Sequence, residues 1–313
     1  MSSSTIAAHH CTDSVPPKKI TIVLQSLQEA LATDSVTCTI PFSRAGNLIL
    51  LRAKADTTEG NFILDTGAPG LVLNITYFRD YTSTTDINEE QSGITGSASG
   101  VKKTQVGELT FGCIKTGLEQ ADLLSLGHLE NTKGVKILGL IGLSLFKQFE
   151  MIIDYENNLL YLHRYAKKIA AIYKNPMLED TSKYSVVPIE IWNNKMVVRT
   201  VMAGKKLRLI IDSGAESNVL DSRLPNKIFE NVEVLRRVQL LGTGDKKVDA
   251  LYGNLNNLTI GDQNTGSLPV LITNLEKTCL ADNSCIDGIL GFDFLSLHKI
   301  GFNFVNNKMY IWK

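Results

Sequence analysis

The sequence predicts a mostly β protein with two β-barrel lobes related by a pseudo-twofold axis, together with a few short helices. Three observations support this prediction. The second half of the chain repeats the first at an offset of 147 positions. Short apolar runs of strand length are separated by Gly, Asn and Asp. An Asp-Thr-Gly or Asp-Ser-Gly triplet occurs at the same place in each repeat.

The repeat is clearest around these two triplets. It aligns "FILDTGAPGLVLN" (62–74) with "LIIDSGAESNVLD" (209–221). The offset then grows by two, as a small loop insertion would cause, and "GLIGLSLF" (139–146) matches "GILGFDFL" (288–295). Two copies of one unit in a chain of 313 residues predict two domains of similar fold.

Strands are expected wherever an apolar or alternating run is bounded by turn residues. They include the segments 47–55, 107–112, 195–203 and 257–261. Each half ends in a predicted hairpin, at 151–162 and 300–311, whose Asn-Asn pair tolerates the positive φ of a tight turn. Apolar residues at helical spacing occur from Ile20 to Leu31 and again at 166–173.

These elements divide the chain into four parts. The segment around "KNPMLEDTSK" is polar and contains proline, which is typical of a connection between domains. We therefore expect an N-terminal arm with a helix, which is a candidate pro-segment (1–39), a first β lobe (40–165), a linker (166–184) and a second β lobe (185–313).

Charge and composition exclude several classes of function. The chain has 32 basic and 32 acidic side chains and no long basic stretch, so a nucleic-acid partner is not expected. No apolar run approaches the roughly 18 residues of a membrane span, and residues 1–19 lack the apolar stretch of an intact signal peptide. His9, His10 and Cys11 are adjacent but have no evident distant partners, so we expect neither a metal nor a cofactor.

The five cysteines leave the cellular compartment open. Cys279 and Cys285 lie six positions apart in "CLADNSC", a short polar loop that a disulfide can close. That reading favours a periplasmic or secreted location. The alternative is a cytosolic protein with free thiols, because the count is odd and a chain of this length does not need disulfides for its core.

The doubled triplet has a specific chemical meaning. A single Asp-Thr/Ser-Gly triplet is usually no more than a turn at the end of a strand. Asp65 and Asp212, however, each follow an apolar strand, and symmetry would bring them together. Two carboxylates about 3 Å apart share one proton, so the pair offers an acid beside a base. Such a pair can activate a water molecule against an amide carbonyl without a covalent intermediate.

The sequences "ILDTGA" and "IIDSGA", with the later "LIG" and "ILG", resemble the aspartic peptidases of the pepsin and retropepsin clan. The resemblance covers roughly residues 40–313 and implies the bilobal fold of that clan. It implies that Asp65 and Asp212 are the catalytic dyad. It also implies a supporting set around the dyad, namely Thr66, Gly67, Ala68, Ser213, Gly214 and Ala215. A psi-shaped loop beneath each carboxylate would come from Leu140, Ile141, Gly142, Ile289, Leu290 and Gly291.

Two further features follow from the resemblance. Ala68 and Ala215 fit the retropepsin type, which usually has one lobe per chain, so this chain is similar to two such lobes fused together. A monomer should then be sufficient for a complete site. Glycine-rich segments at 92–103 and 241–253 are candidates for the flap that closes over substrate, although the first lacks the tyrosine of pepsin flaps; the alternative is an ordinary surface hairpin.

The predicted function is an aspartic endopeptidase that acts on a polypeptide bound as an extended strand between the lobes. The alternative is a protein on the same scaffold that binds peptides or other ligands without cutting them, because a fold does not fix an activity. A third alternative is a structural protein whose aspartates only cap turns, but it leaves the doubled motif unexplained.

Overall fold

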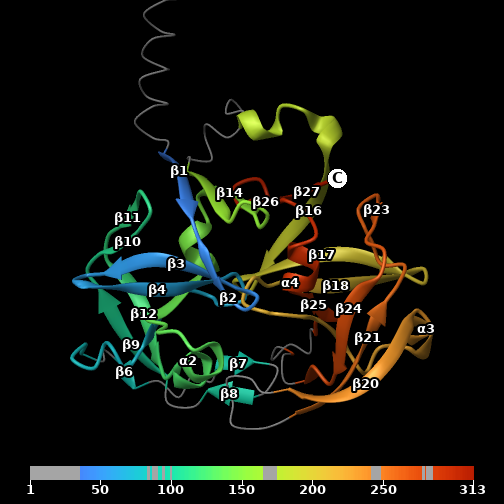
Figure 1. Ribbon diagram of the computed structural model, residues 1–313, viewed down its shortest axis with the longest axis horizontal. Helices are drawn as coiled ribbons and strands as arrows, with labels where there is room; N and C mark the ends of the chain where they lie inside the picture. The colour runs from blue at the N-terminus through green and yellow to red at the C-terminus, as the bar shows by residue number, and fades with distance from the viewer. Residues whose placement is uncertain are drawn as a thin grey trace, which may run out of the picture.

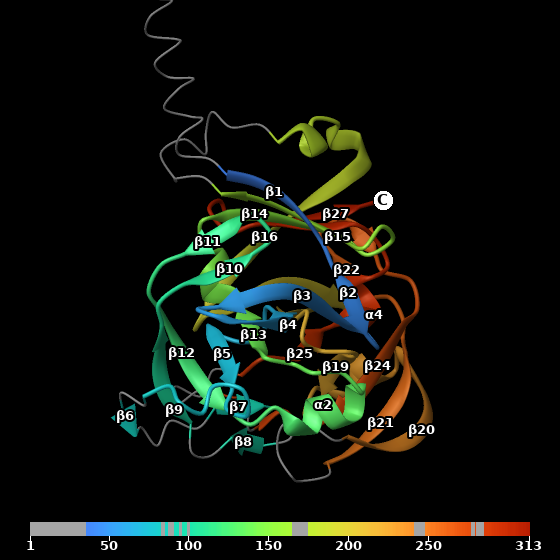
Figure 2. The same ribbon diagram turned by 60° about the vertical axis from the view of Figure 1, so that its left-hand side comes forward.

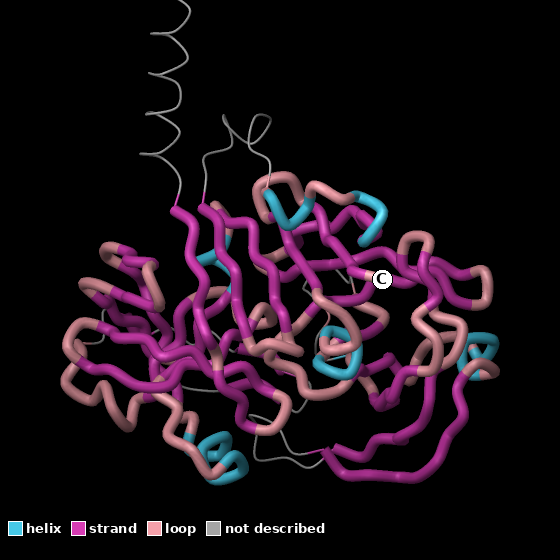
Figure 3. Tube along the Cα trace, turned by 45° about the horizontal axis from the view of Figure 1, so that its top comes forward, coloured by secondary structure: helices cyan, strands magenta, loops and turns pink. Residues whose placement is uncertain are grey.

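The computed structural model describes residues 36–82, 85–86, 91–93, 96–98, 101–164, 175–240, 248–276, 279 and 285–313. These residues are mostly in strands, as the sequence predicts (Figure 3). The helices expected at 20–31 and 166–173 lie outside the described residues. Among the residues that are described, no helix is long and apolar enough to cross a membrane.

The first half of the chain forms a 10-stranded sheet. Its strands pair in the order β11-β10-β3-β4-β13-β5-β12-β9-β6, and β2 pairs with β3. The strands are β2 (Ser43–Ala45), β3 (Leu48–Ala55), β4 (Thr58–Asp65), β5 (Leu71–Asn74), β6 (Thr85–Asp86), β9 (Lys102–Val106), β10 (Leu109–Phe111), β11 (Ile114–Thr116), β12 (Glu119–Leu124) and β13 (Gly139–Gly142).

The second half repeats this arrangement as part of a 15-stranded sheet. The order β22-β17-β18-β25-β19-β24-β21-β20 corresponds strand for strand to β10-β3-β4-β13-β5-β12-β9-β6, and β23 pairs with β22. The directions agree as well: β13 is parallel to β4 and antiparallel to β5, as β25 is to β18 and β19. These strands are β17 (Lys195–Met202), β18 (Lys205–Ile211), β19 (Asn218–Asp221), β20 (Val232–Leu240), β21 (Val248–Leu255), β22 (Thr259–Ile260), β23 (Gln263–Asn264), β24 (Leu268–Thr273) and β25 (Gly288–Leu290).

Six strands join the two halves across the top of Figure 1. They pair in the order β1-β15-β14-β26-β27-β16, and β16 continues into the second half through β17. Asn158 and Asn307, with φ of 54° and 53°, turn the two expected hairpins, and the hairpins meet where β14 pairs with β26. The strands are β1 (Val36–Pro41), β14 (Phe149–Asp154), β15 (Leu159–Arg164), β16 (Tyr184–Trp192), β26 (Ile300–Asn303) and β27 (Lys308–Trp312). β1 thus begins a few residues before the lobe boundary expected at residue 40.

The remaining elements are short (Figures 1 and 3). The helices are α2 (Gly127–Lys133), α3 (Asn226–Phe229), α4 (Phe292–Leu295), and the 3-10 turns η1 (Leu143–Phe146), η3 (Pro176–Leu178) and η4 (Thr181–Lys183). The first flap candidate overlaps a small hairpin of β7 (Gln91–Gly93) and β8 (Gly96–Ala98). In the second candidate, residues 241–247 lie outside the described part of the chain.

The central strands of each half are buried on both faces, which explains their continuous apolar runs. In β4, Phe62 and Leu64 join the large core that spans both halves, whereas Ile63 points into a smaller cluster on the opposite face. Ile210 occupies the position of Ile63 in the corresponding cluster of the second half. Strands that are covered on both faces read as unbroken apolar runs rather than alternating ones. The aspartates that end these runs are therefore held on a rigid support.

Candidate active site

Each predicted catalytic aspartate stands where a central strand ends. Asp65 is the last residue of β4 and lies opposite Gly142 of the parallel strand β13. Asp212 follows β18, and its backbone N–H donates to the carbonyl oxygen of Leu290 in β25 at 3.0 Å. The two positions are equivalent in the duplicated topology. Each half therefore contributes one carboxylate from the carboxyl end of the equivalent strand, β4 or β18.

The turn after each aspartate holds the carboxylate in place. Oδ1 of Asp65 accepts hydrogen bonds from the backbone N–H groups of Gly67 and Ala68, at 2.9 and 3.0 Å. Oδ1 of Asp212 accepts one from the backbone N–H of Gly214 at 2.8 Å. These local bonds are the ordinary reason for Asp at a turn, and here they also fix the direction of each carboxylate.

Thr66 and Ser213 connect the two turns by four hydrogen bonds. The backbone N–H of Thr66 donates to Oγ of Ser213 at 3.0 Å, and the N–H of Ser213 donates to Oγ1 of Thr66 at 2.9 Å. Each hydroxyl then donates to a carbonyl of the other half, that of Ile211 at 3.1 Å and that of Leu64 at 2.8 Å. Both side chains are buried and fully paired. Exchanging either for an apolar residue would leave buried groups unsatisfied.

The glycines of the two turns lie against the opposite carboxylates. A Cβ atom built on Gly67 would lie 2.5 Å from Cγ of Asp212, and one built on Gly214 would lie 2.5 Å from Cγ of Asp65. Real side chains do not approach that closely, so any other residue at either position would force the turn or the opposite carboxylate to move. This constraint comes from the opposite half of the molecule, which shows how closely the two turns approach.

This proximity changes the protonation of the pair. Burial, and next to it the negative charge of Asp212, raise the pKa of Asp65 to about 7, although the N–H groups of Ala68 and Gly67 act in the opposite direction. A proton is therefore retained between the carboxylates up to near-neutral pH, and it belongs to the coupled pair. The site can hold an acid beside a base. Within the described residues, no group of three or more His, Cys, Asp and Glu side chains is placed to hold a metal ion.

The predicted psi-loop residues lie in the strands that pair with β4 and β18, next to the two aspartate turns. Leu140, Ile141 and Gly142 lie in β13, and Ile289 and Leu290 lie in β25 with Gly291 directly after it. The chain beyond these strands is tied to the turns, because Leu143 donates its N–H to the carbonyl of Ala68 at 2.9 Å and Phe292 donates to that of Ala215 at 2.8 Å. The structure thus gathers the predicted dyad, its supporting residues and the psi elements at one place.

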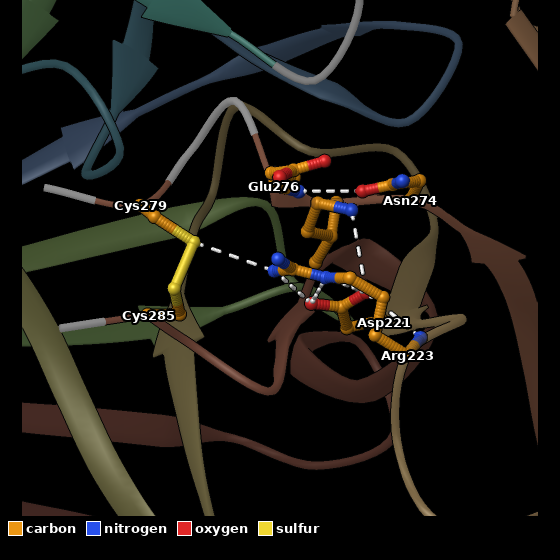
Figure 4. Close-up of a disulfide and its surroundings, with 7 residues drawn as sticks. Asp221, Arg223, Asn274, Glu276, Cys279 and Cys285 are labelled. Atoms are coloured by element: carbon orange, nitrogen blue, oxygen red, sulfur yellow. Dashed lines mark hydrogen bonds and ion pairs between the residues drawn. A yellow bond between two sulfur atoms is a disulfide. The ribbon is translucent and has the colours of Figure 1, made fainter. Parts of the chain in front are cut away.

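Four of the described cysteines form two disulfides. Cys279 and Cys285 are bonded, and Figure 4 shows their setting: Arg223 forms an ion pair with the buried Asp221 at 2.6 Å and donates to Sγ of Cys279 at 3.3 Å. Cys38 and Cys113 form the second disulfide. This second pair could not be predicted from the sequence, because its members lie 75 residues apart and no local pattern marks them.

Sequence reasoning also missed contacts between the halves near the dyad. Lys195 donates to the carbonyl oxygen of Gly67 at 3.3 Å. Glu216 binds Lys133 and Asn47 of the first half. Each of these pairs is more than 80 residues apart, and no local pattern marks them. The one feature of the sequence that could have indicated such a contact is a charged residue, Glu216, four positions after Asp212.

Comparison with known proteins finds a family match in the second half. A family model described as "Aspartyl protease" matches residues 198–294, which run from β17 to α4 and include Asp212. A sequence search of curated proteins finds no match. Among solved structures, the chain resembles basic 7S globulin from soybean with 9% identity and a TM-score of 0.47, over 89% of this chain and 95% of that one. The family match thus covers the second of the two aspartate turns and lies within the second half of the chain.

Proposed function

We propose that the protein is an aspartic endopeptidase with Asp65 and Asp212 as its catalytic dyad. One observation carries this proposal: the hydrogen bonds of Thr66 and Ser213 join the two turns and hold the carboxylates close enough to share a proton. Aspartates that only capped turns would not need to meet. Each would be satisfied by its own N–H bonds.

The reaction follows from the shared proton. The ionised carboxylate of the pair takes a proton from a water molecule bound between Asp65 and Asp212, and that water attacks the carbonyl carbon of the peptide bond. The protonated carboxyl group donates its proton to the carbonyl oxygen as charge develops there. As the tetrahedral intermediate collapses, the carboxyl group that took the proton from water donates it to the amide nitrogen, and a hydroxyl of the intermediate returns its proton to the other carboxylate. The C–N bond then breaks and the amine leaves. No covalent bond to the protein forms at any step.

The proposed substrate is a polypeptide in extended conformation, bound between the two halves above the turns. One chain supplies both carboxylates, so a monomer is proposed to be sufficient for activity. The proposed location is extracytoplasmic, periplasmic or secreted, because disulfides persist in oxidising compartments and the structure has two of them.

Digestion of a peptide library, with the products identified by mass spectrometry, tests the proposal. The wild-type protein should cleave internal peptide bonds at acidic to neutral pH. The control is the protein with both Asp65→Asn and Asp212→Asn, prepared in parallel, which should leave the library intact. A folded wild-type protein that retains peptides on a column but yields no products would instead support a binding protein on this scaffold.

A further inference from the structure

Glu216 lies four residues after Asp212, yet its carboxylate is bound by the first half of the molecule. Nζ of Lys133 binds Oε1 of Glu216. The backbone N–H of Asn47 donates to Oε2 at 3.3 Å, and Nδ2 of Asn47 donates to the backbone oxygen of Glu216, also at 3.3 Å. Two separate elements of the first half, the end of α2 and the turn between β2 and β3, therefore hold the second catalytic turn. Figure 2 shows α2 as the green helix in the lower part of the molecule.

In the ion pair of Lys133 and Glu216, the lysine side chain is largely shielded from water, whereas the glutamate is partly exposed. The side chain of Lys133 is 11% exposed and that of Glu216 is 39% exposed. The pair of Lys115 and Glu108, within one hairpin, is 68% and 45% exposed. Exposed pairs contribute little, whereas removing one partner of a buried pair leaves an uncompensated charge. The contact between Lys133 and Glu216 is therefore of the kind that can hold two segments together.

Lys133 is itself fixed to the framework of the first half. It is the last residue of α2, where the helix dipole favours a cation. One turn earlier, Glu130 accepts hydrogen bonds from the hydroxyl of Tyr77 at 2.6 Å and the N–H of Ile137 at 2.9 Å, and its other oxygen accepts one from Asn74 at 3.2 Å. A continuous set of contacts thus runs from the end of β5 through α2 to the second catalytic turn.

The duplicated half of the molecule lacks this arrangement. The position equivalent to Glu216 is Pro69, which has no carboxylate. The residue equivalent to Asn47 is Asn194, and it accepts a hydrogen bond from the exposed Lys147 at 3.1 Å. The clasp between Glu216 and Lys133 is therefore one-sided, and it is not a general requirement of the Asp-Ser/Thr-Gly turn.

We infer that Glu216 and Lys133 are positioning residues, whose ion pair holds the second catalytic turn at the distance from the first at which the two aspartates act together. The inference rests on the proposed peptidase function. The bonds of Thr66 and Ser213 connect the turns to each other, and Lys195 adds a bond from the second half to the carbonyl oxygen of Gly67 in the first turn. The ion pair of Glu216 and Lys133 attaches the second turn to α2 of the first half at a further point.

The test compares Glu216→Gln and Lys133→Met, alone and combined, with Glu108→Gln as the matched control at an exposed ion pair. Misplacement of catalytic groups by about 1 Å can lower turnover by about 100-fold. We expect each clasp variant to lower kcat by about tenfold to 100-fold with a smaller change in KM, and the double variant to be no worse than the singles. The control should keep the wild-type kcat.

A second readout separates positioning from a purely structural role. If the turns move apart, the carboxylates repel each other less, so the upper limb of the pH profile of kcat/KM should shift to lower pH in the clasp variants. The charge-exchanged protein, Glu216→Lys with Lys133→Glu, should recover part of the lost kcat. Clasp variants that unfold more readily but keep the wild-type kcat and pH profile would overturn the inference. An inactive wild-type protein would instead overturn the proposed function, and this role with it.

Discussion

Gly67→Ala and Gly214→Ala should inactivate the protein without unfolding it. Neither glycine has a positive φ, so alanine can adopt the backbone conformation at both positions. The obstacle is the opposite carboxylate, because the new Cβ would lie 2.5 Å from Cγ of Asp212 or Asp65. One added methyl group therefore acts directly on the distance between the two halves of the site.

The expected magnitude follows from this distance. Ordinary contact begins at 3.4 Å, so the turn or the carboxylate must move by about 0.9 Å, and a misplacement of that size can cost about 100-fold in rate. We expect kcat/KM to fall by about 100-fold or more in either variant. Overpacking of this kind should lower the free energy of unfolding by about 1–3 kcal/mol, which a domain of ordinary stability tolerates.

Peptide hydrolysis and urea unfolding should be measured on the same preparations. Gly117→Ala is the matched control, because a Cβ at Gly117 meets nothing within 4 Å and the backbone there has no positive φ. It should keep wild-type activity and be as stable as the wild type or slightly more stable. The reasoning is refuted if folded Gly67→Ala and Gly214→Ala hydrolyse peptides at the wild-type rate.

Three other predictions concern pH and assembly. The pH profile of kcat/KM should be bell-shaped with its upper limb near pH 7. The reason is that the pKa of Asp65 is raised to about 7, and the acid of the pair is lost above that pH. A rate that rises steadily through about pH 9 would contradict this prediction. Burial raises the pKa of Glu150 above its usual 4.5, against hydrogen bonds from Asn175 and Asn303, so its contribution to stability is complete below that value and is lost as the pH rises. Urea unfolding between about pH 4 and pH 8 should show a shallower decline for Glu150→Gln than for the wild type, and an identical decline would exclude Glu150 as the cause. Activity per molecule should be constant on dilution, as sedimentation under assay conditions can verify, and a loss of activity that follows dissociation of a dimer would show that one chain is insufficient.

Much of the fold could be predicted from the sequence, because the chain contains two copies of one pattern. The apolar runs before Asp65 and Asp212 are continuous because β4 and β18 are covered on both faces, so a few neighbouring residues predict each strand. The hairpin turns can also be predicted from neighbouring residues, because Asn158 and Asn307 tolerate a positive φ. The mostly β class was confirmed for these reasons. The structure adds the strand order, which is the same in both halves.

The contacts between the halves could not be predicted in this way. The pair of Lys133 and Glu216 and the disulfide of Cys38 and Cys113 depend on how distant segments meet, and residue type alone does not specify the partner. The pairing of β14 with β26 likewise joins two segments that are far apart in the sequence. Symmetry suggested that Asp65 and Asp212 meet, but only the three-dimensional arrangement shows that each turn glycine lies against the opposite carboxylate.

The most direct test of the account is the rate of peptide hydrolysis by Asp65→Asn, by Asp212→Asn and by the protein carrying both changes. Each single change leaves one carboxylate that cannot be acid and base together, so each should lower kcat/KM by several orders of magnitude, and the double variant should be scarcely worse. All three should fold, and Asp65→Asn should be at least as stable as the wild type at pH 7, because burial and Asp212 disfavour the ionised form of Asp65. Folded single variants that cleave peptides at near wild-type rates would contradict the account.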